Sequence, residues 1–217
     1  VTGGTQVSKL TSASLTGKVS ADGTSIGSHS LASNVEILDT YGDTQTLRVY
    51  PSRLAGVNLT SGMVRWYSTN AQGEIDRLIL NDVTGDLHQY GVLTDVTEQS
   101  FGMALMSSYV YDIAGVPGVY TSQTTIWNLE KGPCQVRMDG KEVERIYNLT
   151  GAALTAVDGK TAMAGAQAWT ISDSVVVYEY RDKNYYLSDL SRVSGGSYDL
   201  MGYYDKAQDQ GGRIRVV

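Results

Sequence analysis

Short runs of β-branched and aromatic residues recur along this chain, with turn-forming residues between them. Residues 35–38, 109–111 and 175–180 are the clearest runs. Such residues suit a pleated, half-buried surface, so the pattern predicts β-strands. Segments such as 41–43 and 181–184 carry Gly, Asp and Asn, which close tight turns. Because no window of 11 or more residues has a convincing helical period, the chain is predicted to be all-β.

One hairpin pattern occurs three times. Each copy has an apolar strand, a variable turn and a second strand that carries an Arg; the copies span residues 61–78, 131–146 and 199–214. Each copy closes a longer segment with a similar start, at Leu15-Thr16, Leu93-Thr94 and Leu154-Thr155. A repeated segment of this kind indicates an array of small, similar units.

The repeats predict three tandem β units, at residues 1–82, 83–149 and 150–217. Each unit is expected to be a small barrel or sandwich of about five to six strands with one short helical turn. The helical turns are predicted around residues 51–55 and 187–191. The middle copy diverges most, so it is either a true repeat or an inserted meander.

Charge and composition argue against several classes of function. The net charge is -6 and the pI is near 4.9. Binders of nucleic acid and of anionic membranes normally carry a basic face, so both partner classes are disfavoured. No apolar run approaches the roughly 20 residues of a membrane-spanning helix, so membrane insertion is not expected. No signal peptide is visible and Val1 begins in mid-pattern, which suggests an excised or processed form.

No residue pattern indicates catalysis, a cofactor or a metal site. His29 and His88 are flanked by polar residues, and neither accompanies a nucleophile motif, so both are predicted to be surface residues. The single cysteine, Cys134, allows no intrachain disulfide and is expected to be buried. Residues 205–209 are predicted to form only a polar hairpin tip, and no calcium-loop pattern occurs. The chain is therefore predicted not to be an enzyme.

An Arg recurs in each hairpin copy, and two explanations are open. The residues are Arg77, Arg145 and Arg213. They could form an anion-binding ladder, or they could serve the scaffold as cross-strand ion pairs and as stems that cover apolar surface. The scaffold interpretation is preferred. Binding, if any, is then expected at the variable hairpin tips, residues 68–73, 139–141 and 205–211.

Tyrosine is concentrated late in the sequence. Seven of the 15 tyrosines are Tyr178, Tyr180, Tyr185, Tyr186, Tyr198, Tyr203 and Tyr204. Aromatic rings stack on sugars and serve at adaptable contacts, but with only one Phe present they are also needed in the core. The candidate ligand contacts are Trp66, Tyr203 and Tyr204.

Several sequence segments resemble the non-anchor region of surface-layer-homology (SLH) proteins of Gram-positive gut anaerobes. They lie at residues 73–86, 174–179, 202–206 and 211–216, and the resemblance extends from about Leu10 to the end. The SLH anchor itself is not in this sequence. The resemblance implies an exported cell-wall or cell-surface protein and carries no catalytic residue with it.

These observations favour a non-catalytic structural or interaction segment of a cell-envelope protein, with a cell-wall polymer, a glycan or another envelope protein as partner. The first alternative is a carbohydrate-binding module that uses Tyr and Trp side chains. The second is a glycan-active hydrolase accessory or catalytic domain. The composition, rich in Thr, Ser, Gly and Tyr, is typical of secreted or surface-displayed β proteins.

Overall fold

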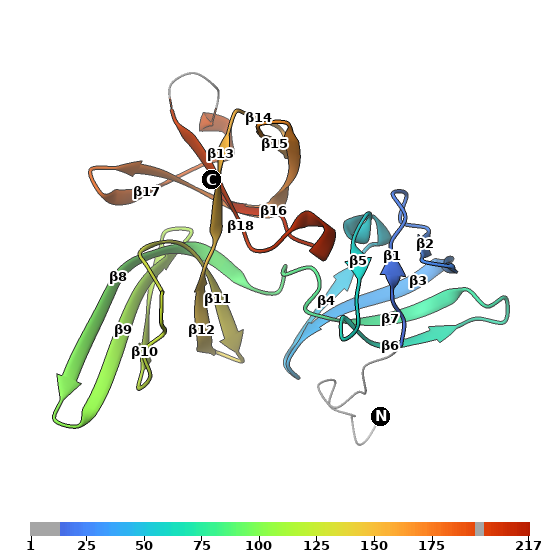
Figure 1. The fold of residues 1–217 in the computed structure, drawn as a ribbon, viewed down its shortest axis with the longest axis horizontal. Helices are drawn as coiled ribbons and strands as arrows, with labels where there is room; N and C mark the ends of the chain where they lie inside the picture. Colours follow the sequence, from blue (N-terminus) through green and yellow to red (C-terminus); the bar gives the residue numbers. More distant parts are fainter. Residues whose placement is uncertain (1–13, 194–197) are drawn as a thin grey trace. The chain divides into compact units, whose positions relative to one another are not determined.

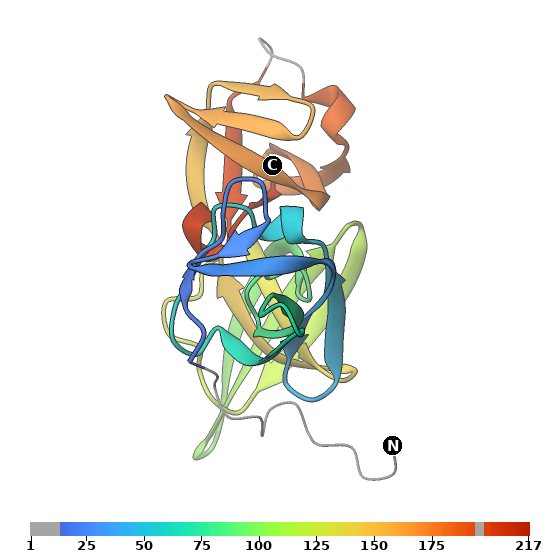
Figure 2. The same ribbon diagram turned by 90° about the vertical axis from the view of Figure 1, so that its right-hand side faces the viewer.

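The computed structural model describes residues 14–193 and 198–217, and within them the fold is all-β, as predicted (Figure 1). Leu10, where the SLH resemblance begins, lies outside the described residues. The helical segments are short 3-10 turns: η2 (Pro51–Leu54), η3 (Leu190–Arg192) and η4 (Gln208–Gln210). The first two coincide with or overlap the predicted helical turns. The sheets are curled into half-barrels, as Figures 1 and 2 show.

The chain packs as two compact units. Unit 1 comprises Val1–Leu87 together with Lys206–Gly212, and unit 2 comprises His88–Asp205 together with Arg213–Val217. The three-unit division at residues 1–82, 83–149 and 150–217 stays a prediction beside this grouping.

Unit 1 is built around one five-stranded sheet. Strand β3 at its centre pairs antiparallel with β4 and parallel with β7, and β7 pairs antiparallel with β6. Among its described residues, the strands are β1 (Gly17–Lys18), β2 (Ser25–Ile26), β3 (His29–Tyr41), β4 (Gln45–Val49), β5 (Asn58–Leu59), β6 (Val64–Thr69) and β7 (Ile75–Asn81). One face buries an apolar core that includes Ile37, Leu78 and Leu80, so the opposite face of these strands is left for solvent.

The described residues of unit 2 form two sheets. The five-stranded sheet consists of β8 (Gln89–Phe101), β9 (Ala104–Ile113), β10 (Val116–Ser122), β11 (Gly132–Asp139) and β12 (Glu142–Asn148). The seven-stranded sheet consists of β13 (Thr150–Leu154), β14 (Ala156–Asp158), β15 (Thr161–Ala164), β16 (Gln167–Arg181), β17 (Asn184–Ser188), β18 (Leu200–Tyr204) and β19 (Ile214–Val216). Each sheet has its own apolar core, one around Tyr109 and Ile146 and the other around Trp169 and Ile171.

The three predicted hairpins are all antiparallel strand pairs, β6–β7, β11–β12 and β18–β19. In the first and third, the closing strand also pairs parallel with a long strand, β7 with β3 and β19 with β16. In the second, the opening strand β11 pairs antiparallel with β8 instead. The first and third copies thus share a pairing scheme that the middle copy lacks, and the tandem repeat itself stays a prediction.

A buried arginine connects the two sheets of unit 2. Arg215 on β19 is 1% exposed, and its guanidinium lies 4.7 Å from the ring centroid of Tyr90 on β8. It donates to Asp205 Oδ2 at 3.0 Å and to Ser172 Oγ at 3.4 Å. The hydroxyl of Tyr90 donates to the same Asp205 oxygen at 3.2 Å, and Gln135 Nε2 on β11 donates to that hydroxyl at 2.9 Å. Burying a charge costs free energy unless an opposite charge and hydrogen bonds compensate for it, and these partners provide that compensation.

Asp205 corrects one prediction from the sequence. Residues 205–209 were expected to form only a polar hairpin tip, but the side chain of Asp205 is 4% exposed and pairs with Arg215. Its other oxygen accepts from the backbone N–H of Arg213 at 3.2 Å. The chain then leaves unit 2 for the segment Lys206–Gly212, which packs in unit 1. There the carbonyl of Gly211 accepts from Arg53 Nη2 at 2.8 Å, and Arg53 also pairs with Asp86.

We expect Arg215→Met to lower the free energy of unfolding by about 3–5 kcal/mol, because it leaves the Asp205 carboxylate buried and unpaired. Urea denaturation at pH 7 measures this loss. Lys160→Met is the control, because Lys160 and Asp173 form an ion pair whose side chains are 76% and 71% exposed, and it should cost at most about 1 kcal/mol. Replacing both buried partners, Arg215→Met with Asp205→Leu, should recover part of the loss. Equal losses for Arg215→Met and Lys160→Met would contradict the assignment.

The stability of the chain should fall at alkaline pH. Burial raises the pKa of Tyr90, and the nearby Asp205 carboxylate adds to the rise while Arg215 opposes it. Because the folded chain then holds this proton more tightly than the unfolded chain, stability is complete below about pH 10 and is lost as pH rises further. Tyr90→Phe should reduce this slope by up to about 1.4 kcal/mol per pH unit. Urea titrations between pH 9 and 11 test the slope, and an unchanged slope in the variant would disprove the role of Tyr90.

Candidate functional site

A hollow on the surface of unit 2 is lined by tyrosines, and we call it the tyrosine groove. Its volume is about 620 Å³, and its aromatic lining comes from Tyr178, Tyr180, Tyr185, Tyr198 and Tyr203. This size lies in the usual range for small-ligand sites. Five of the seven late tyrosines noted in the sequence thus line one surface hollow.

Strand geometry brings three of these tyrosines together. Tyr178 and Tyr180 lie two residues apart on β16, so their side chains project from the same face of the strand. A turn at Asp182 and Lys183, both with positive φ, leads into β17, where Tyr185 pairs with Tyr180. The ring of Tyr185 lies 4.8 Å from that of Tyr180 and 6.1 Å from that of Tyr178.

Hydrogen bonds hold the inner tyrosine in place. The hydroxyl of Tyr178 donates to Asp112 Oδ1 at 2.9 Å and accepts from the backbone N–H of Ala114 at 3.0 Å. Burial raises the pKa of Tyr178 and of Tyr185, so both phenols are neutral at physiological pH. The outer tyrosines are free to contact a ligand, since Tyr180 is 62% exposed and Tyr198 is 57% exposed.

Polar side chains also line the tyrosine groove. Glu179, Arg192 and Asp199 contribute two carboxylates and one guanidinium. These groups can accept and donate hydrogen bonds to hydroxyl groups. The groove therefore combines aromatic faces with a polar lining whose formal charge is negative by one.

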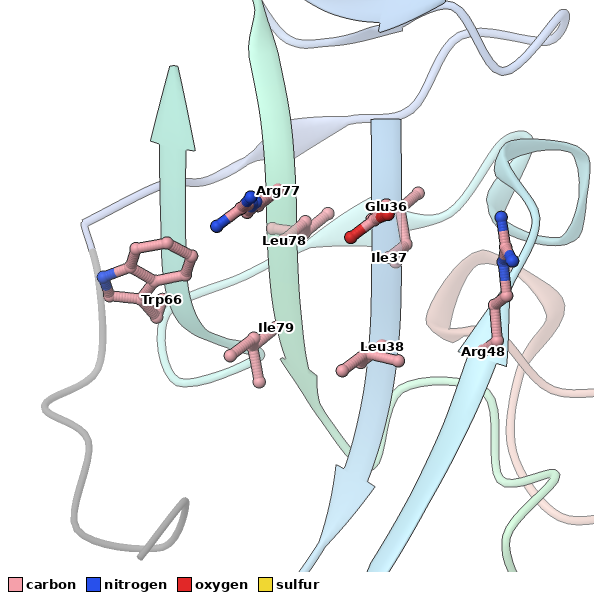
Figure 3. Close-up of a pocket in the computed structure, with 8 residues that line it drawn as sticks. All are labelled: Glu36, Ile37, Leu38, Arg48, Trp66, Arg77, Leu78 and Ile79. Atoms are coloured by element: carbon pink, nitrogen blue, oxygen red, sulfur yellow. The ribbon is translucent and has the colours of Figure 1, made fainter. Parts of the chain in front are cut away.

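A second hollow lies on the solvent-facing side of the sheet in unit 1, and we call it the tryptophan hollow (Figure 3). Its volume is about 430 Å³. Four side chains form a row across four strands, because register pairs Arg48 with Leu38, Leu38 with Ile79, and Ile79 with Trp66. The next row contains Glu36 on β3 opposite Arg77 on β7, and both residues also line the hollow.

The structure distributes the three candidate contact residues over three places. Trp66 lines the tryptophan hollow of unit 1, and Tyr203 lines the tyrosine groove of unit 2. Tyr204 lies half-buried against Trp169, with ring centroids 4.3 Å apart, in the core of the seven-stranded sheet. The alternation of Tyr178 and Tyr180, followed by a turn and Tyr185, was the sequence signal that could have located the groove.

The repeated arginines have different surroundings. Arg77 is exposed in the tryptophan hollow, whereas Arg145 lies over the ring of Tyr147 at 5.0 Å. Arg213 is half-buried, and its backbone N–H donates to Asp205. The arginines of the three hairpins therefore do not form one common kind of contact.

The structure places the single cysteine and both histidines in defined surroundings. Cys134 is buried, as predicted, and burial raises its pKa to about 12. The prediction that His88 is a surface residue is wrong, because only 7% of it is exposed. His29 lies edge-on to Tyr67, with ring centroids 6.5 Å apart.

Residues 14–193 and 198–217 contain no cluster of three or more His, Cys, Asp or Glu side chains that could hold a metal ion. The same ranges contain no helix with the length and apolar character needed to cross a membrane.

Comparison with protein-family models, with curated proteins and with solved structures finds no match for this chain.

Proposed function

We propose that this chain is a non-catalytic interaction segment of an exported cell-surface protein, and that unit 2 binds a glycan in the tyrosine groove. One observation carries the proposal: five tyrosines gathered from β16, β17, β18 and the segment before β18 line a single hollow of about 620 Å³. The cell-surface setting rests on the resemblance to SLH proteins and on the composition.

Tyrosine suits this role for two reasons. The ring offers an apolar face to the C–H groups of a sugar, and the hydroxyl can exchange hydrogen bonds with sugar hydroxyls. Few side-chain torsions must be immobilised on binding, so the cost in conformational entropy is low. Tyr180 and Tyr198 are the most exposed of the five and are the expected stacking surfaces.

The charges of the groove favour a neutral glycan. Glu179, Asp199 and Arg192 line the groove, and Glu179 also pairs with Arg181 at 3.8 Å. An anionic ligand would therefore meet no excess of positive charge at this site. Carboxylates and guanidinium can instead orient a neutral sugar by hydrogen bonds to its hydroxyls.

We expect the intact chain to bind neutral oligosaccharides on a glycan array. In calorimetric titrations of the strongest array ligand, Tyr180→Ala and Tyr198→Ala should each weaken binding about three- to tenfold, because each removes a stacking surface. Tyr203→Ala tests the residue proposed from the sequence and should weaken binding in the same way.

Tyr186→Ala is the matched control. Tyr186 is exposed on the same strand as Tyr185 but does not line the groove. Its loss should leave affinity unchanged, and so should Trp66→Ala in unit 1. An array without any glycan ligand, or equal weakening by Tyr186→Ala and Tyr198→Ala, would refute the proposal.

A further inference from the structure

We propose that the tryptophan hollow of unit 1 is a separate binding site for an anionic saccharide, a sugar that carries a carboxylate or a phosphate group. The proposal rests on the side chains of unit 1 alone and does not depend on the tyrosine groove.

The hollow offers a stacking surface next to an apolar strip. Trp66 is 39% exposed on β6, and Ile79 and Leu38 continue the row across β7 and β3 (Figure 3). An exposed indole is the largest aromatic face that a protein can offer to a sugar ring. Side chains alternate between the two faces along β7. Because Leu78 and Leu80 point into the core, Ile79 between them faces the hollow.

Two arginines flank this strip. Arg48 on β4 and Arg77 on β7 both line the hollow, and the strands that carry them are both neighbours of β3. With strands about 4.8 Å apart, their backbones lie about 10 Å from each other, which leaves room for a ligand across β3. Guanidinium groups bind carboxylates and phosphates with paired hydrogen bonds.

Neither of these arginines is held by a carboxylate. Within the described part of the chain, the side chains of Arg48 and Arg77 make no hydrogen bond and no ion pair; Arg48 lies only near the ring of Tyr50, at 5.7 Å. Arg53 and Arg215, by contrast, are each held by a carboxylate at about 3 Å. A chain with net charge -6 thus presents two guanidinium groups without a carboxylate partner in the described structure beside an exposed indole.

Glu36 determines how the site can be tested. It lies opposite Arg77 in the register of β3 and β7, yet forms no ion pair with it in the described structure. Its carboxylate can accept hydrogen bonds from sugar hydroxyls, but it repels the anionic group of the ligand. Removing this charge should therefore strengthen binding, an effect that damage to the fold would not produce.

The test is calorimetric titration of the intact 217-residue chain with three probes: a galacturonate trisaccharide, a neutral galactose trisaccharide and galactose 6-phosphate. With the tyrosine groove weakened by Tyr180→Ala and Tyr198→Ala, we expect one or both anionic probes to bind at least about tenfold more tightly than the neutral one. Which anionic probe binds identifies the carboxylate or the phosphate as the recognised group. If neither anionic probe binds more tightly than the neutral sugar in that double variant, the proposal fails.

Variants assign the binding to the hollow. Arg77→Gln and Arg48→Gln should each weaken the anionic probe about tenfold, and Trp66→Ala should weaken it about three- to tenfold. Glu36→Gln should strengthen it about three- to fivefold. At an ionic strength of about 1 M, where the Debye length is about 3 Å, the affinity should fall, whereas a neutral ligand of the tyrosine groove should be little affected.

Two charge-matched controls are available. Arg145→Gln changes the arginine at the corresponding position of the second hairpin, and Lys18→Gln removes an exposed positive charge elsewhere in unit 1. Neither residue lines the hollow, so both variants should bind like the natural chain. Tyr198→Ala should also leave anion binding unchanged, which separates this site from the tyrosine groove. Weakening by the controls equal to that of Arg77→Gln, or a loss of affinity in Glu36→Gln, would overturn the assignment.

Discussion

Unit 2 depends on a buried charge. Arg215 is enclosed at the end of the chain, and its position is acceptable only because Asp205, Ser172 and the ring of Tyr90 surround it. These partners come from both sheets of the unit. Removing the guanidinium would therefore weaken the contact between the two sheets. An unpaired charge at this depth would cost several kcal/mol, which makes the relative arrangement of these strands a condition of folding.

The tyrosine groove is built on the same strands. Its lining includes residues from β16, β18 and β19. Arg215 lies on β19, directly before the groove residues Val216 and Val217. The side chains that hydrogen-bonded strands hold in place lose little entropy when a ligand binds. The tryptophan hollow has a comparable support, because parallel pairing of β3 with β7 places its two rows of side chains side by side.

Much of the local structure was predictable. The runs at 35–38, 109–111 and 175–180 are strands because their residue types and short spacing between turns leave few other choices. Two short helical turns and the three antiparallel hairpins also follow from local sequence. The candidate sites were only partly predictable: Trp66 and Tyr203 each line a hollow, but Tyr204 turns into the core beside Trp169. Alternation along β18 places these two neighbouring tyrosines on opposite faces, and the sequence does not say which face is covered.

Residue types were enough to predict the all-β class and the strand segments, because both depend on the conformational preferences of neighbouring residues. It took the folded chain to show that Arg48, Arg77 and Trp66 meet on one sheet face, and that Asp205 is buried against Arg215. Both outcomes depend on pairings between strands distant in sequence, such as β3 with β7, and on which side chains those pairings remove from water. Local residue preferences carry no information about such partners. From the sequence, Asp205 is therefore predicted to be a solvated turn residue, whereas in the fold it is the counter-charge of a buried cation.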